Sequence, residues 1–273
     1  MNPENLQLLD FAPWVALMPA WLLVLFRLTG IFLFTPLFSS RVIPGNVKII
    51  LALGLSFCIF PMLLSVGKTS SVSVMAIAAS GLSLWTVVPA VIGELLTGSV
   101  IGFAATMPLI GMQLGGRIAS QQMGLGLAEV FSPGAEQAGI TSQFLYLLGL
   151  SIFLLLGGHR LLLEVLVGSF DHVPLGGVIA GEGVLRLVVG LFGAAFELAL
   201  HVAAPLLALI FLQTLALGFI ARTVPQLNIL SIGFALRILA GGVTLTLVVS
   251  VISGRFIISM SSTLRELASF FGL

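Results

Sequence analysis

The chain has 273 residues, of which 59% are hydrophobic and 8% are charged, and its formal net charge is +1. Soluble domains contain roughly 25% charged residues, so a soluble globule of this size would have too few polar side chains to cover its exterior. The near-zero net charge provides no basic face for nucleic acid. We therefore expect an all-α, polytopic membrane protein that binds no nucleic acid.

Long apolar segments occupy most of the chain. A membrane-spanning helix needs about 20 mostly apolar residues. Six segments reach or approach that length, at residues 13–38, 47–66, 75–112, 140–158, 184–224 and 229–260. The third and fifth are too long for one span and contain prolines, which remove a helix hydrogen bond and bend the helix. We predict that these two are either long, bent helices or pairs of short ones.

Two breaks between these segments share one pattern. A proline follows an arginine by three residues at Arg41 and Pro44, and again at Arg222 and Pro225. Proline ends one helix and pre-sets the first turn of the next. The pattern predicts a tight helical hairpin near each end of the chain, and it is either a short internal repeat or a coincidence.

Four charged residues lie inside apolar segments, namely Arg27, Glu94, Glu197 and Arg237. A charge at membrane depth is costly and usually faces protein or water. These side chains either relay protons or ions, or pair across helices or subunits. Two acids and two bases favour pairing.

Small residues recur at the spacing that lets helix backbones approach closely. Gly98 and Gly102 form one such pair, and Gly111 and Gly115 form another. This spacing predicts tight helix packing.

The stretch from Gln113 to Gly134 is rich in glycine and in uncharged amides. Glycine permits irregular backbone, which membrane proteins tolerate where it is buried in protein or lines a cavity. Methionine, an adaptable filler, occurs nearby at Met107, Met112 and Met123. The stretch is therefore either a deformable plug within a pore or a buried re-entrant loop that only packs.

Sequence motifs of catalysis are missing from the chain. It contains no His-Glu-x-x-His zinc motif, no Gly-x-Ser-x-Gly nucleophile elbow and no phosphate-binding Gly-x-x-x-x-Gly-Lys loop. Its three histidines are far apart in sequence. We expect a protein that is not an enzyme, with no catalytic residue, cofactor or metal.

Several motifs together resemble the FliR family of flagellar biosynthesis proteins, called SctT in injectisomes. The motifs, in chain order, are Arg27-Leu-Thr-Gly, residues 41–48, residues 115–133 around Gln122-Met-Gly-Leu, Gly157-Gly-His, Ala216-Leu-Gly-Phe-Ile-Ala-Arg, residues 224–228 and Gly233-Phe. The resemblance covers nearly the whole chain. Its flagellar branch is favoured over the injectisome branch.

This resemblance implies a core subunit of the flagellar type III export gate, in the bacterial inner membrane at the basal body. Part of the assembly would stand above the periplasmic membrane surface. The implied partners are FliP-like, FliQ-like, FlhB-like and FlhA-like proteins, unfolded flagellar substrates and membrane lipid. The chain would form a single domain, with a FliP-like part over about residues 1–139 and a continuation over about residues 140–273 to a FliQ-like hairpin.

The resemblance also implies that residues 111–133 plug the closed channel. The candidate plug and gate residues are Met107, Gly111, Met112, Gln113, Gly115, Gly116, Arg117, Gln121, Gln122, Met123, Gly124, Leu125, Gly126, Phe131 and Pro133. Arg117 and Ser132 depart from the acidic residues that family members often have at these positions.

Two other functions remain open on the sequence. A small-solute secondary transporter would use the interrupted helices and the two Arg-x-x-Pro turns as repeats around a midplane site. A scaffold subunit would share the assembly without taking part in gating.

Overall fold

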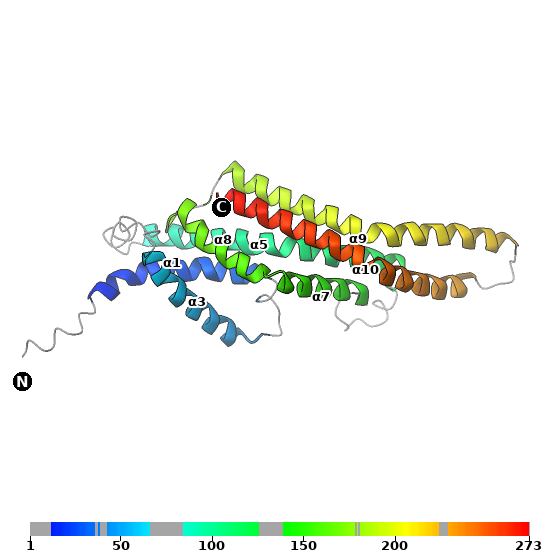
Figure 1. Ribbon diagram of the computed structural model, residues 1–273, viewed down its shortest axis with the longest axis horizontal. Coiled ribbons are helices and arrows are strands. Elements are labelled where there is room, and N and C mark those ends of the chain that lie inside the picture. The colour runs from blue at the N-terminus through cyan, green and yellow to red at the C-terminus, as the bar shows by residue number, and fades with distance from the viewer. Residues whose placement is uncertain are drawn as a thin grey trace, which may run out of the picture. The chain divides into compact units, whose positions relative to one another are not determined.

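The structure is a computed structural model that describes residues 12–35, 38, 43–65, 84–125, 139–177, 179, 181–223 and 229–272. Within these ranges it contains seven α-helices and no strand (Figure 1). The helices are α1 (Ala12–Phe34), α3 (Gly45–Ser65), α5 (Leu84–Gln122), α7 (Ile140–Leu155), α8 (Gly158–His172), α9 (Glu182–Thr223) and α10 (Ile229–Phe270).

Five of these helices are long and apolar enough to cross a membrane, or six spans result if α7 and α8 count as one bent span. Helices α1 and α3 contain 23 and 21 residues, which match a bilayer core about 30 Å thick at about 1.5 Å per residue. The predicted all-α, polytopic membrane fold is confirmed.

The described part of each overlong segment forms one continuous helix, and residues 75–83 lie outside the described residues. Helix α5 has 39 residues and α9 has 42, so each is longer than a bilayer core requires. Pro108 lies within α5 and Pro205 within α9 without ending either helix. Of the two alternatives, the long helix is therefore right and the pair of short helices is wrong. Helix α10 continues to Phe270, beyond the predicted end at Met260.

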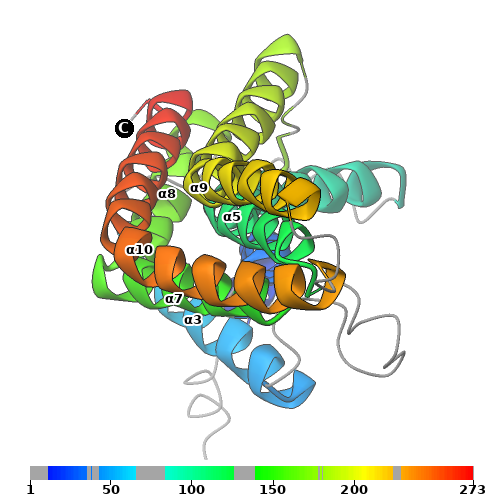
Figure 2. The ribbon, with the colours of Figure 1, turned by 90° about the vertical axis from the view of Figure 1, so that its right-hand side faces the viewer.

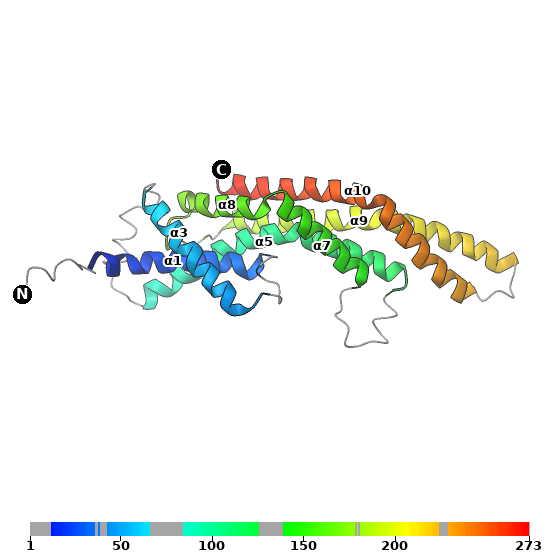
Figure 3. The same ribbon diagram turned by 60° about the horizontal axis from the view of Figure 1, so that its bottom comes forward.

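The chain divides into two compact units. The first comprises Met1–Phe103, Arg160–Arg186 and Leu267–Leu273. In it, α3 crosses α1, as Figures 1 and 3 show, and the first half of α5 packs against the other face of the α1 backbone. Val24 and Leu28 of α1 and Leu63 of α3 are completely buried there.

The second unit comprises Ala104–His159 and Leu187–Glu266. Here the second half of α5 contacts α7 and α9, and Met123, which directly follows α5, contacts α10. Figure 2 shows α7 and α10 side by side. A core cluster joins Ala119 of α5 and Met123, which directly follows α5, to Leu206 and Ile210 of α9.

Candidate functional site

The first unit is organised around a buried ion pair between α1 and α5. Arg27 donates from Nε to Glu94 Oε2 at 2.5 Å and from Nη2 to Glu94 Oε1 at 3.1 Å. Both side chains have no exposed surface. Such a two-point pair is strong and directional, and it offsets part of the cost of removing both charges from water.

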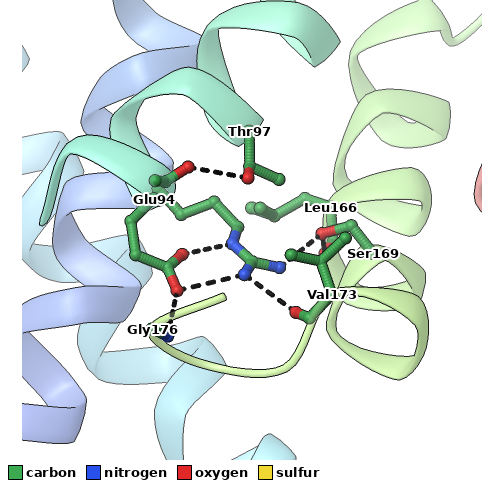
Figure 4. Close-up of polar contacts among 8 residues, drawn as sticks. Glu94, Thr97, Leu166, Ser169, Val173 and Gly176 are labelled. Atoms are coloured by element: carbon green, nitrogen blue, oxygen red, sulfur yellow. Dashed lines mark hydrogen bonds and ion pairs between the residues drawn. The ribbon is translucent and has the colours of Figure 1, made fainter. Parts of the chain in front are cut away.

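The rest of the Arg27 guanidinium is satisfied by α8 and the turn that follows it (Figure 4). Nη1 donates to Ser169 Oγ at 3.0 Å, and Nη2 donates to the Val173 carbonyl at 2.9 Å. The guanidinium carbon also lies 4.0 Å from the centre of the Phe170 ring, which adds a cation–π contact. The Gly176 amide donates to Glu94 Oε1 at 2.8 Å. We call these residues the Arg27 cluster, which ties α1, α5, α8 and residues 173–176 together.

Three glycines allow the ion pair to form, because they bring the α1 and α5 backbones into contact. A Cβ added at Gly30 would lie 2.5 Å from the Leu95 carbonyl oxygen, and one at Gly102 would lie 2.5 Å from the Ile31 carbonyl oxygen. A Cβ at Gly98 would collide with the Arg27 carbonyl. The tight packing predicted from the spacing of Gly98 and Gly102 is confirmed.

The second glycine pair packs just as closely, in the second unit. An added Cβ would lie 2.7 Å from the Ala195 carbonyl oxygen at Gly111 and 2.8 Å from the Ala199 carbonyl oxygen at Gly115. At Gly116 it would lie 2.7 Å from Ser142 Cα. Helix α7 is also bonded to α5 near Gly116, because Ser142 Oγ donates to the Gln113 carbonyl at 2.9 Å.

These contacts correct the prediction of irregular backbone after Gln113. The stretch is helical through Gln122, because close contact with α7 and α9 compensates the conformational cost of each glycine, about 0.5–1 kcal/mol. Met107 and Met112 are buried in this packed helix. The glycines here serve close approach of helices.

Helix α5 ends in a glycine-capped turn. The Gly124 amide donates to the Gln121 carbonyl and the Leu125 amide to the Ser120 carbonyl, both at 3.1 Å. Gly124 has φ +83°, the left-handed conformation that this pair of bonds requires. The side chain of Met123 is buried against Gly241 of α10, where an added Cβ would collide with the methionine sulfur.

The remaining candidate plug residues fall into two groups. Arg117, Gln121 and Gln122 are exposed on α5. Gly126, Phe131 and Pro133 lie outside the described residues.

Glu197 and Arg237 do not join the Arg27–Glu94 arrangement as a second pair. Glu197 is exposed on α9 and lines a cavity of about 120 Å³ together with His201 and Arg255. Arg237 donates from Nη2 to Thr214 Oγ1 at 3.2 Å.

The residues of the two predicted hairpin turns are only partly described. Pro44 precedes α3 and its carbonyl accepts from the Val47 amide at 3.0 Å. Arg222 is exposed in the last turn of α9. Arg41 and Pro225 lie outside the described residues.

The sequence predicts Arg27 and Glu94 as charged residues that pair within the membrane protein, but it does not predict the other residues that contact them. Ser169, Phe170, Val173 and Gly176 belong to a stretch that reads as an ordinary polar connection. Two of the contacts use backbone atoms, which any residue type supplies, so no sequence signal could have identified them.

Long apolar helices, backbone contacts at glycines and the fully buried Arg27–Glu94 pair define a polytopic helical membrane protein. The family model for bacterial export proteins, family 1, matches residues 18–262, and the chain belongs to this family. The resemblance inferred from the sequence motifs is confirmed.

Three relatives from different bacteria share one name, and each is matched over most of its length. The chain is 31% identical over 246 residues to the flagellar biosynthetic protein FliR of Bacillus subtilis (strain 168), a match that covers 87% of this chain and 89% of the relative. It is 29% identical to the FliR protein of Escherichia coli (strain K12), covering 84% and 83%, respectively. It is 28% identical to that of Aquifex aeolicus (strain VF5), covering 90% and 89%.

Proposed function

We propose that this chain is a non-enzymatic core subunit of the flagellar type III export gate, which forms and plugs the channel for unfolded flagellar proteins. Membership in the export family and similarity to FliR proteins support a flagellar export role. The several apolar helices support a place in the bacterial inner membrane. The lengths of α5, α9 and α10 support the further proposal that part of the assembly rises above the periplasmic membrane surface.

The gating proposal rests on the resemblance of residues 111–133 to the plug of the export family, and the packing of α5 describes how the first part of this stretch is held. Gly111, Gly115 and Gly116 fix this helix against its neighbours, and Met123 is held at Gly241. A helix packed at backbone distance cannot deform without losing those contacts. Within the proposed plug of residues 111–133, we therefore assign Gly111–Leu125 as a fixed base.

Exposed apolar side chains support the proposal of several partner subunits. Phe211 and Phe219 of α9 are 66% and 75% exposed, and Leu247 of α10 is 74% exposed. Large exposed apolar surface marks contact with lipid or with other proteins. We propose that FliP-like, FliQ-like, FlhB-like and FlhA-like subunits, together with lipid, cover these faces in the assembly.

The charged residues have separate proposed roles. The Arg27 cluster stabilises the first unit, because it satisfies both buried charges within the chain. Glu197 and Arg237 are proposed to contact other subunits.

Deleting residues 126–133 tests the gating role most sharply. The deletion begins after the glycine-capped end of α5, so it leaves the packed base of the proposed plug in place. We expect the gate to assemble at normal levels and the inner membrane to become permeable to small ions, measured as loss of membrane potential. An assembled gate that remains ion-tight after this deletion contradicts the plug and leaves a scaffold role.

A further inference from the structure

The first unit contains a groove between α1 and α3 with a volume of about 420 Å³. Its α1 wall includes Thr29, Phe32 and Leu33, and its α3 wall includes Ile49 and Ala52. Both walls belong to helices that are long and apolar enough to cross a membrane. The groove is of the size that ligand sites have, roughly 300–1,000 Å³.

The lining of this groove is almost wholly apolar. Among its lining residues, the polar side chains are those of Thr29 and Lys48. The Thr29 hydroxyl donates to the Leu25 carbonyl of its own helix at 2.8 Å, so it is already satisfied. The groove therefore favours a hydrocarbon occupant, with one basic side chain as its main polar feature.

The basic side chain lies at one end of the groove. Lys48 is in the first turn of α3, and Phe38 follows the end of α1, where its ring lies 4.2 Å from that of Phe32. Because the lengths of α1 and α3 match the bilayer core, the ends of these helices reach the level of the lipid headgroups. Lys48 thus lies where a headgroup would be, and the apolar groove lies where an acyl chain would be.

The surrounding sequence favours a negative headgroup. Residues 35–50 include Arg41 and Lys48 and no acidic residue. Basic residues beside a spanning helix attract anionic lipid, at about 1 kcal/mol each.

A helix from another protein fits the groove less well than an acyl chain. A helix about 10 Å across fills roughly 420 Å³ in each turn, so the groove would hold only about one turn. An acyl chain is thinner and can lie along the groove.

We propose that the α1–α3 groove binds one anionic phospholipid, with an acyl chain between the helices and the phosphate near Lys48. This site is independent of the export role and would serve any function of the chain. A lipid held there would fill the space between α1 and α3 and stabilise the hairpin.

The test uses the protein extracted from the membrane in mild detergent, together with any subunits that remain bound to it. It compares variants at two neighbouring exposed positions of α3. Ile49 is 60% exposed and lines the groove, whereas Ile50 is 69% exposed and does not. After removal of native lipid, palmitoyl-oleoyl phosphatidylglycerol and the matching phosphatidylcholine are added in equal amounts, and bound lipid is counted by native mass spectrometry. I49W blocks the groove, I50W is the matched control, and K48Q removes the basic side chain.

We expect I49W to lose one tightly bound phosphatidylglycerol for each copy of this chain, and I50W to keep it. K48Q should weaken phosphatidylglycerol binding about fivefold and leave phosphatidylcholine binding unchanged. Equal lipid binding by I49W and I50W overturns the site. Unchanged preference for phosphatidylglycerol in K48Q overturns the assignment of an anionic headgroup.

Discussion

Arg27 and Glu94 are 67 residues apart in the chain, and their side chains meet through two hydrogen bonds in a site without solvent exposure. The pair forms where α1 and α5 touch at glycines, so backbone packing and charge pairing depend on each other. Arg27 also reaches Ser169 and the Val173 carbonyl, which connects this crossing to α8. The stability of the first unit should therefore depend strongly on these few side chains.

Removing one member of the pair should be costly. R27M leaves the Glu94 carboxylate buried with only the Gly176 amide as its donor, and a broken buried pair costs about 3–5 kcal/mol. The double variant R27M/E94L removes both charges, so its loss of stability should be clearly smaller than the sum of the two single losses. Thermal unfolding of the purified protein measures all three. Additive losses would show that the two side chains do not interact.

Exchanging the two charges should not rescue the pair. In R27E/E94R a carboxylate at position 27 would face the Val173 carbonyl oxygen, which now accepts a hydrogen bond from Arg27. Two acceptors repel, so we expect the exchanged variant to unfold at a lower temperature than the wild-type protein. Wild-type stability in this variant would mean that the Val173 contact is unimportant.

Ser169 should contribute more to the stability of the folded protein than an ordinary helix serine does. S169A leaves Arg27 Nη1 without its 3.0 Å acceptor in a buried site, which costs about 1–3 kcal/mol. Ser151 provides a matched control, because its hydroxyl donates to the Leu147 carbonyl of its own helix on an exposed face. The melting temperature should fall for S169A and stay nearly constant for S151A. Equal shifts in the two variants would remove Ser169 from the cluster.

Adding a single methyl group at Gly98 should separate α1 from α5. G98A places a Cβ against the Arg27 carbonyl, and overpacking of this kind costs about 1–3 kcal/mol. G54A is the control, since a Cβ at Gly54 of α3 meets nothing within 4 Å. We expect lower cellular levels and earlier unfolding for G98A alone. A stable G98A protein would show that the crossing can widen without loss.

A methyl group at Gly241 tests the base of the proposed plug. G241A displaces the Met123 side chain, whereas G242A meets nothing within 4 Å. Because methionine is flexible, the loss of stability in G241A should be small, about 1 kcal/mol. Export of flagellar proteins, measured in culture medium, should fall in G241A and not in G242A. Normal export in both variants would separate the position of Met123 from gating.

The sequence was sufficient for the helical membrane fold, because long apolar segments leave few alternatives. It was also sufficient for the close packing at Gly98 and Gly111, since their spacing alone exposes a helix backbone. For the region after Gln113 the prediction of irregular backbone from its many glycines was wrong, because the chain is helical through Gln122. The conformational cost of these glycines is offset by close contact with Ala195 and Ala199 of α9, some 80 residues later in the chain. No local sequence pattern predicts such a contact.

Which of the charged residues pair with each other could not be predicted from the sequence, for the same reason. Arg27 and Glu94 stood out because charge in an apolar segment is costly. Their pairing with each other, and the separate surroundings of Glu197 and Arg237, depend on which helices pack together. That information lies in the tertiary structure.

In our proposal this chain works as one subunit of an export gate. The most direct test is purification of the tagged chain, expressed with and without the genes beside its own, followed by native mass spectrometry. We predict a stable hetero-oligomer with FliP-like and FliQ-like chains, and an unstable protein when they are missing. A stable homo-oligomer that ignores those chains would contradict the claim and favour a small-solute transporter.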